Sequence, residues 1–333
     1  MSTLVINKAS ISVKLEANHL VLHDHADGGP LQRVPLVDVD RVIVVGQPAI
    51  TFPVLAKLMD LRIPCSFLTA GGKWRGLMDG DGGFHAGRRI KQYAYVIDES
   101  KCSSLVRRLV LSKILNSRRT IQRLAAERGW TLDEFPEYAN LTRLAGEISF
   151  MKTAVSIRGI EGIAAACYFG LLSRFFPYDA PFPRRSRRPP RDAANALMSF
   201  VYMLLANVFT AAVRAHGLDV AGGFFHRGID RSPSLALDLM EPFRPAWADR
   251  LVLNLLNHRR IKACCHFSGN SEDGVFLNDE GRKIVFVAFD EMMSRRISVD
   301  GQKITLRQVV DKEICRFITA IEGGCEMQFF RAA

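Results

Sequence analysis

The sequence predicts an α+β protein, with a small N-terminal β-rich domain followed by a larger all-α domain. Two observations along the 333 residues predict this class. Over the first 95 residues, apolar and polar side chains alternate at the period of two that strands require. From about residue 100 onward, apolar side chains recur at helical spacing. We therefore expect domains at residues 1–95 and 105–333, joined by a linker at 96–104.

Several N-terminal segments have strand character. Residues 3–24 alternate, with Val13 and Leu15 among the apolar positions. The runs VDRVIVVG and IPCSFLT are short and rich in β-branched or apolar residues, as buried strands are. The run ITFPVLAKLMDLR between them favours a short helix.

The rest of the chain is predicted to be helical. The segment SSLVRRLVLSKILNSRRTIQRLAAE places Leu105, Leu109 and Ile121 on one apolar stripe. Arginines, from Arg107 to Arg119, lie on the opposite face. Further helices are expected at residues 138–176, 193–216, 234–241, 245–262, 280–296 and 305–322.

The composition is that of a globular protein without a membrane-spanning segment. Hydrophobic residues make up 48% of the chain, and no uninterrupted apolar run reaches the roughly 20 residues that a span requires. The N-terminus enters the alternating pattern at once, without the features of a signal peptide. The seven cysteines are odd in number and lack a CxxC spacing. We therefore expect reduced thiols, no zinc site and a cytoplasmic location.

The positive charge is concentrated in the middle of the chain. The net charge is +11, and the whole excess lies between Lys101 and Arg260, where 24 Lys and Arg stand against 13 Asp and Glu. Of those basic residues 21 are arginine, whose planar guanidinium group suits phosphate. The distribution indicates either a polyanionic partner such as double-stranded DNA or a merely soluble basic surface.

The densest basic cluster lies in the run PFPRRSRRPPR, at residues 181–191. Its prolines exclude a helix interior, so we expect an exposed, extended loop. Such a run is usually a solvated loop, but its position between two helices that carry other polar residues favours contact with phosphates. The candidate DNA-contacting residues are Arg184, Arg185, Arg187, Arg188 and Arg191.

Two polar residues stand in apolar surroundings in the second half of the chain. Glu161 lies near the start of a helix of small residues that we expect to be buried. A buried carboxylate needs a partner, and Arg158 or a metal ion is the candidate. His226 follows two aromatic residues, where a histidine is more often packed or hydrogen-bonded than a ligand.

Two further carboxylates, Asp238 and Glu241, lie three residues apart and therefore on one face of a short helix. Like charges at that spacing repel one another, so this apolar segment needs a nearby cation. Arg231, Arg244 and a divalent metal are the candidates.

Carboxylates and one imidazole together form a mixed oxygen and nitrogen donor set. The set is Glu161, His226, Asp238 and Glu241. It suits Mn²⁺ and tolerates Mg²⁺, whereas zinc usually has more His or Cys ligands. Such a metal polarises a phosphodiester oxygen and activates a bound water or sugar hydroxyl.

Four motifs occur in order along the second half of the chain: IRGIEGIAAACYF, NALMSFVYMLL, HGLDVAGGFFHRG and SPSLALDLMEPFRPAWAD. Their order and spacing resemble those of the CRISPR-associated adaptation endonuclease/integrase family, the Cas one proteins. The front end, with VPLVDVDRVIVVG, and the tail, with GVFLNDEGRKIVF, are similar to the family pattern as well. The resemblance spans nearly the whole chain.

The resemblance implies an N-terminal β-domain that forms a homodimer and a C-terminal α-helical catalytic domain. It places the metal ligands on Glu161, His226 and Glu241, with Asp238 as an accessory acidic group of the catalytic site. Some members have Asp at the last ligand position, and Glu241 is one methylene longer.

By the same resemblance, the reaction is attack of a protospacer 3′-hydroxyl on a phosphodiester of the CRISPR repeat, a transesterification in spacer acquisition. Metal-dependent DNA cleavage is the related hydrolysis. The small Cas two protein would bridge two dimers of this chain. Tyr168 and Asn195 lie in matching motifs, and we expect them to support the site, although Tyr168 also fits a core aromatic.

Two other functions are open to a sequence with these residues. A metal-dependent phosphohydrolase of small nucleotides would use the same carboxylates but would need no extended basic surface. A non-catalytic DNA-binding scaffold would use the acidic residues only in ion pairs with arginines.

Overall fold

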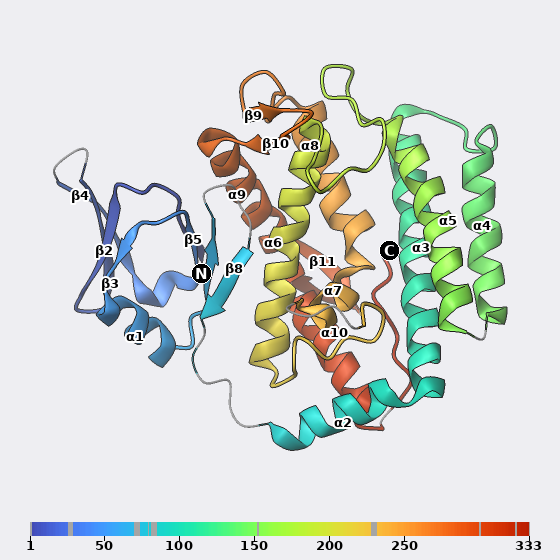
Figure 1. Cartoon of the computed structure of the whole chain (residues 1–333), viewed down its shortest axis with the longest axis horizontal. Helices are drawn as coiled ribbons and strands as arrows, with labels where there is room; N and C mark the ends of the chain where they lie inside the picture. Colours follow the sequence, from blue (N-terminus) through green and yellow to red (C-terminus); the bar gives the residue numbers. More distant parts are fainter. Residues whose placement is uncertain are drawn as a thin grey trace. The chain divides into compact units, whose positions relative to one another are not determined.

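In the computed structural model, the chain divides into two compact units (Figure 1). The first comprises Met1–Phe84 and Asn278–Asp290, and the second comprises His85–Leu277 and Glu291–Ala333. The structure describes residues 2–25, 29–69, 74–78, 80, 85–151, 153–227, 232–299, 301–323 and 325–332. The first unit is rich in strands and the second in helices.

The first unit contains two four-stranded sheets. Its elements are β1 (Ser2–Ile6), β2 (Ile11–Glu16), β3 (His19–Asp24), β4 (Gly29–Pro35), η1 (Leu36–Asp38), β5 (Val39–Val45), β6 (Ala49–Ile50), α1 (Phe52–Asp60), β7 (Cys65–Leu68) and β8 (Trp74–Met78). One sheet has the strand order β1-β5-β7-β8 and the other the order β4-β3-β2-β6. Both β1 and β7 run parallel to β5, and β8 pairs with β7 in the antiparallel direction.

The core of the first unit follows the alternation in the sequence. Val13 of β2 pairs with Leu22 of β3, and both side chains are buried. β5 lies between two parallel neighbours, and Val42, Ile43 and Val44 in succession are buried, as in a strand covered on both faces. The strands and the short helix predicted in this region are confirmed as β5, β7 and α1.

The second unit is built mainly of helices. Its elements are α2 (Ala86–Ile97), α3 (Glu99–Arg128), α4 (Pro136–Glu147), η2 (Ile148–Phe150), α5 (Ala154–Ser173), α6 (Ala193–Ala215), α7 (Ser234–Met240), the π-helix η3 (Arg244–Asp249), α8 (Arg250–Asn257), β9 (Phe267–Asn270), β10 (Gly274–Leu277), β11 (Arg296–Val299), β12 (Gln302–Thr305) and α10 (Leu306–Ile321). Helix α9 (Asp279–Ser294) begins in the first unit and ends in the second. Figure 1 shows α3, α4 and α5 side by side, and α6 packs against α7, η3 and α10.

The structure differs from the predicted domain organisation in three respects. Residues 96–104 are not a linker, because α2 and α3 meet at Asp98, which caps α3 by accepting hydrogen bonds from Ser100 N and Lys101 N. The division between the units lies after Phe84 instead of residue 95. The second unit is not all-α, since β9–β10 and β11–β12 form two antiparallel ribbons.

The helix predicted at residues 138–176 is two helices, α4 and α5, and α5 is only half buried. Thr153 caps α5 by accepting a hydrogen bond from Ser156 N. The side chain of Ile163 is 54% exposed, whereas Ile157 and Leu171 are buried. The expectation that the helix of small residues is buried is therefore met by only one of its faces, which packs against the other helices.

Two helices, α5 and α6, are long and apolar enough to cross a membrane by length and composition alone. This outcome differs from the expectation based on uninterrupted apolar runs. The window in α6 is 78% buried, as in the core helix of a soluble protein, whereas that in α5 is 33% buried.

The segment 325–332 is bound to α3 by residues more than 200 positions away in sequence. Asn116 Nδ2 donates to Phe330 O at 3.0 Å, and Asn116 Oδ1 accepts from Ala332 N at 2.9 Å. The Phe330 ring stacks on Phe243, with the ring centroids 4.4 Å apart. These contacts hold the middle of α3 beside the segment that follows α7.

Replacing Glu313 by Gln should make stability less sensitive to pH between about 4.5 and 7. Glu313 is fully buried on α10 and accepts a hydrogen bond from Phe330 N at 3.0 Å. Burial raises its pKa from 4.5 to about 7. The folded state therefore keeps a proton that the unfolded state loses, so this stabilisation is fully present below pH 4.5 and is lost as the pH rises to about 7.

Urea unfolding of wild type and Glu313→Gln at several pH values measures this effect. The stability of the variant relative to wild type should rise across that interval. A variant that loses stability as steeply as wild type would contradict the assignment.

Candidate active site

Three segments of the second unit meet at one largely buried ammonium group. Nζ of Lys113, on α3, lies 2.5 Å from Oε1 of Glu161, on α5. The same Nζ lies 2.8 Å from Oε2 of Glu241, directly after α7. Two of the predicted metal ligands therefore converge on a single cation, although they are distant in sequence.

Positive charge keeps Glu241 ionised. Its other oxygen, Oε1, accepts a hydrogen bond from Arg244 Nη1 at 2.6 Å. Burial alone would raise the pKa of Glu241, but Arg244 and Lys113 lower it to about 2. Burial likewise opposes the charge of Lys113, yet the carboxylates of Glu241 and Glu161 keep its pKa above the ordinary value. The cluster is therefore charged at neutral pH.

The cations expected to accompany the carboxylates are partly confirmed. Arg244 pairs with Glu241, as one alternative required. Arg158 instead donates from Nη2 to Phe225 O at 2.8 Å, and Lys113 is the cation beside Glu161. Arg231 lies outside the residues that the structure describes.

His226 is oriented by Asp238, which is fully buried on α7. Oδ1 of Asp238 lies 2.6 Å from Nδ1 of His226. The two oxygens of Asp238 also accept hydrogen bonds, at 2.6–3.0 Å, from the backbone N–H groups of Phe224, Phe225 and His226. The charge of Asp238 is thus compensated by N–H donors. Because the carboxylate contacts Nδ1 of the imidazole, the other ring nitrogen, Nε2, can act as a ligand. Metal-bound histidines usually have a carboxylate or carbonyl partner of this kind on the second nitrogen.

The loop that carries His226 approaches α7 closely at Gly223. A Cβ atom on Gly223 would lie 2.6 Å from Ser234 Cβ and 2.9 Å from Asp238 Oδ2. No residue with a side chain fits there without a shift of the loop or the helix. Gly223 therefore permits the hydrogen bonds through which Asp238 positions His226.

A third buried carboxylate, Asp249, lies close to Arg244. Asp249, at the end of η3, accepts hydrogen bonds from Tyr168 Oη at 2.7 Å and Tyr202 Oη at 2.5 Å. Burial raises the pKa of Asp249 to about 6 despite these hydrogen bonds. The Arg244 guanidinium lies over the Tyr202 ring, 4.5 Å from its centroid. Tyr168 is thus a buried aromatic that also supports the site, through Asp249.

The predicted ligands have the donor chemistry for a metal but are arranged around a lysine. Within the described residues, no group of three or more His, Cys, Asp or Glu side chains is placed to hold a metal ion. Glu241 Oε2 is buried, and the Lys113 ammonium group, 2.8 Å away, is its cationic partner. His226 also helps to lower the pKa of Glu241, after Arg244 and Lys113. A buried carboxylate oxygen turned to a cation has the donor chemistry of a metal ligand.

The arginine loop is exposed, as predicted, with one exception. Its exposed members are Arg184, Arg187, Arg188 and Arg191. Arg185 instead donates from Nη1 to Asn195 Oδ1 at 2.8 Å, and its guanidinium lies over the Tyr202 ring. Asn195 is fully buried and also donates to Arg184 O at 2.8 Å. Arg185 and Asn195 therefore shape the loop, and Arg185 differs from the other predicted phosphate contacts in being held within the protein.

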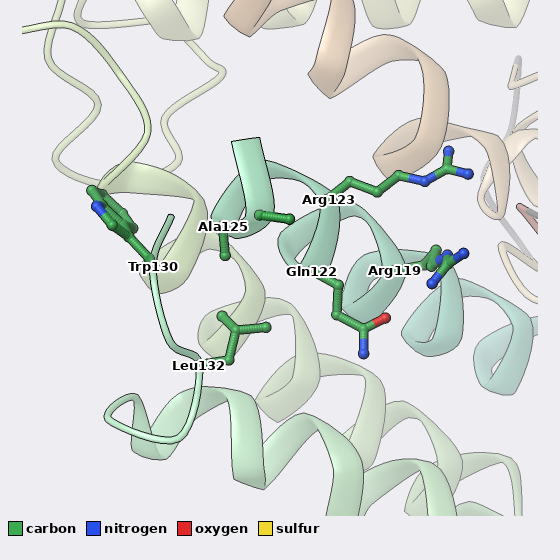
Figure 2. Close-up of a pocket in the computed structure, with 7 residues that line it drawn as sticks. Arg119, Gln122, Arg123, Ala125, Trp130 and Leu132 are labelled. Carbon is green, nitrogen blue, oxygen red and sulfur yellow. The ribbon is translucent and has the colours of Figure 1, made fainter. Parts of the chain in front are cut away.

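A pocket of about 410 Å³ lies on the C-terminal half of α3 (Figure 2). It is lined by Arg119, Gln122, Arg123, Ala125, Ala126, Trp130 and Leu132. Figure 2 shows Arg119 and Arg123 extending from the same side of the helix. Burial and the nearby guanidinium groups of Arg250 and Arg119 lower the pKa of Arg123, which indicates concentrated positive charge. The lining residues include no carboxylate or histidine, so this pocket suits an anion and is separate from the candidate metal ligands.

Lys113 and Asp249 were not among the predicted site residues. Lys113 lies on the apolar stripe of α3, in line with Val110 and Ile121, both of which are buried. A lysine in such a stripe is almost never buried unless it is paired. The place of Lys113 in an apolar stripe was therefore the feature of the sequence that could have identified it as a site residue.

Comparison with known proteins places the chain among CRISPR-associated proteins. Residues 4–291 match the profile of a family described as CRISPR associated protein Cas1. The chain is 34% identical over 303 residues to the CRISPR-associated endonuclease Cas1 1 of Chlorobaculum tepidum, with 89% of this chain and 88% of that protein covered. It is also 30% identical over 308 residues to a CRISPR-associated exonuclease Cas4/endonuclease Cas1 fusion of Rhodospirillum rubrum. That match covers 88% of this chain but only 52% of the fusion protein.

A solved structure shares the fold over the whole length. The Cas1 protein of Thermotoga maritima superimposes with a TM-score of 0.82 at 26% identity, and the match covers 100% of both chains. The mixed α/β architecture with a small N-terminal β-rich part is therefore that of a solved Cas1 protein.

The substitution Gly223→Ala should destabilise the protein by about 1–3 kcal/mol, because the added Cβ has no room against Ser234 and Asp238. Chemical unfolding measures the loss. Gly170→Ala on α5 is the matched control: nothing lies within 4 Å of the added Cβ, so a gain of about 0.5–1 kcal/mol is expected from helix propensity. A Gly223→Ala protein as stable as wild type would show that the loop is not closely packed.

Proposed function

This chain belongs to the CRISPR-associated Cas1 family, and we propose that it is a metal-dependent DNA endonuclease and integrase of spacer acquisition. The proposed reaction joins a protospacer 3′-hydroxyl to a phosphodiester of the CRISPR repeat by transesterification. DNA cleavage, with water as the nucleophile, is its hydrolytic counterpart. The name of the Chlorobaculum tepidum relative, an endonuclease, supports the proposed class of reaction.

The observation that carries the proposal is the convergence of Glu161 and Glu241 on one buried cation. We propose that these two carboxylates and Nε2 of His226 bind Mn²⁺ or Mg²⁺, because a mixed oxygen and nitrogen set suits these ions. When bound, such a metal polarises the phosphodiester and activates the attacking hydroxyl or water. The hydrogen bond from Asp238 to the opposite imidazole nitrogen supports the role of His226.

The other residues of the site hold these groups in place before substrate binds. Arg244 keeps the Glu241 carboxylate ionised and turned toward α3. Asp249, through Tyr202, fixes the aromatic ring on which Arg244 lies. Groups that are already oriented and charged need no reorganisation when charge develops on the scissile phosphate.

We propose that double-stranded DNA, protospacer and repeat alike, contacts two basic surfaces. One is the exposed part of the arginine loop at residues 184–191. The other is the side of α3 that carries Arg119 and Arg123, on the helix that also carries Lys113. Guanidinium groups bind phosphates without reading the base sequence, as a protein that accepts many protospacers requires.

The proposed partners follow from the family resemblance. The N-terminal unit would form the homodimer, and the small Cas two protein would bridge two dimers. All seven cysteines are free thiols, which supports the proposed cytoplasmic location. No membrane takes part in the proposed reaction.

A non-catalytic DNA-binding scaffold is the alternative that one observation favours. Lys113 and Arg244 already neutralise both carboxylates, and an ion-paired cluster of this kind needs no metal. A phosphohydrolase of small nucleotides is not favoured, because the anion-binding pocket on α3 is lined by no candidate metal ligand.

Strand transfer should be lost in Glu161→Gln and in His226→Ala, whereas DNA binding should remain. Loss of an outer-sphere partner alone costs about 10–100-fold, so loss of a ligand should reduce the rate by more than about 100-fold. The assay follows Mn²⁺-dependent joining of a labelled duplex with free 3′-hydroxyl ends to a repeat-bearing plasmid. Glu147→Gln on α4, whose side chain is 41% exposed and pairs with Arg143, is the matched control. Full activity in both site variants would refute the assigned ligands, and wild type that binds DNA without any strand transfer would support the scaffold alternative.

The double variant Arg187→Gln/Arg188→Gln should weaken DNA binding and flatten its dependence on salt. Each phosphate contact contributes about 0.9 to the slope of log Kobs against log salt, so two lost contacts lower the slope by about 1.8. The control Arg33→Gln/Arg143→Gln removes the same charge from exposed residues elsewhere. Equal slopes for the two double variants would show that the loop does not contact phosphates.

A further inference from the structure

We propose that Lys113 is an internal counter-ion that occupies the metal position in the metal-free protein and that the metal must displace. This inference rests on the proposed metal site and goes beyond it, because it gives a role to a residue outside the predicted ligand set. In this role Lys113 allows the metal-free protein to fold with two carboxylates side by side, and it weakens metal binding enough to keep it reversible.

The geometry allows only one cation at this position. Lys113 Nζ contacts Oε1 of Glu161 and Oε2 of Glu241 at 2.5 and 2.8 Å. A Mg²⁺ ion binds carboxylate oxygens at about 2.0–2.1 Å, so an ion shared by the same two oxygens would overlap the ammonium group. Metal binding through both carboxylates therefore requires that Nζ moves away.

The charges explain why a cation is needed when no metal is bound. The side chain of Glu241 is 2% exposed and that of Glu161 21% exposed. Two carboxylates so close in a buried place repel each other, and an uncompensated buried charge costs several kcal/mol. The ammonium group removes this repulsion, and its flexible four-carbon stem allows it to move.

The surroundings of the cluster permit the exchange. Arg244 binds the other oxygen of Glu241, Oε1, so Glu241 remains paired when Lys113 leaves. The side chain of Lys113 is 18% exposed, which leaves the cluster a route to solvent. A hydrated ion entering by that route meets the carboxylates and the ammonium group together.

The test is the affinity of the full-length, metal-free protein for Mn²⁺, measured by isothermal titration calorimetry, together with thermal unfolding. The variant Lys113→Met keeps the length of the side chain and removes its charge. It should bind Mn²⁺ at least about tenfold more tightly than wild type, a difference of about 1.4 kcal/mol. Its Tm without metal should be lower than that of wild type, and saturating Mn²⁺ should raise its Tm by more.

Several controls separate this role from a purely structural ion pair. Lys113→Arg keeps the charge and should retain the weaker affinity of wild type. Lys91→Met removes an equal charge from an exposed position of α2 and should leave the affinity unchanged. Lys113→Gln repeats the neutral substitution with a polar side chain. Folding of both neutral variants only in the presence of Mn²⁺ would also agree with the proposal. Failure of both neutral variants to fold even at saturating Mn²⁺ would overturn it.

The outcomes distinguish this inference from the proposed function. Wild type that binds no Mn²⁺, or binds it equally well as Glu161→Gln, would refute the metal site itself. Wild type that binds Mn²⁺ through Glu161, with an equal or lower affinity in a folded Lys113→Met, would refute only the counter-ion role.

Discussion

The candidate site depends on opposite charges that share one buried position. The ammonium group of Lys113 lies between the carboxylates of Glu161 and Glu241, and either charge alone would be costly to bury. This requirement fixes α3, α5 and the turn after α7 relative to one another. Asn116, one turn along α3, adds an uncharged hydrogen bond, in which its Nδ2 donates to Pro242 O at 2.7 Å. The ion pairs that build the candidate site therefore also hold these helices together.

Burial has opposite outcomes for two carboxylates in the same part of the unit. Glu241 has two cations as neighbours, and its pKa is held at about 2. Asp249 has tyrosine hydroxyls as its closest partners, and its pKa rises to about 6. Arg244 acts on both groups. The Glu241 carboxylate is therefore hard to protonate, because two cations stabilise its charge. The Asp249 carboxylate is protonated more easily, because burial outweighs its hydrogen bonds.

Periodicity was sufficient to predict elements whose pattern is strong, such as α6 and α7, and the family motifs singled out the carboxylates and the histidine as candidates. The partner of Glu161 was missed because it comes from α3, far away in sequence, and no local pattern shows which helix will lie opposite. The internal contacts of Arg185 were missed for the same reason, since its partners, Asn195 and Tyr202, become neighbours only through the fold. Asp98 begins a helix within residues 96–104, where composition suggested a linker.

The hydrogen bonds between Asn116 and the backbone of Phe330 and Ala332 join residues 214 and 216 positions apart. During synthesis at about 5–20 residues per second, α3 leaves the ribosome roughly 10–40 seconds before these partners exist. Contacts of such long sequence separation also form slowly, because a large loop must close first. The Asn116 side chain therefore has water as its partner until the end of synthesis, and the C-terminal segment packs onto α3 only late in the maturation of the protein.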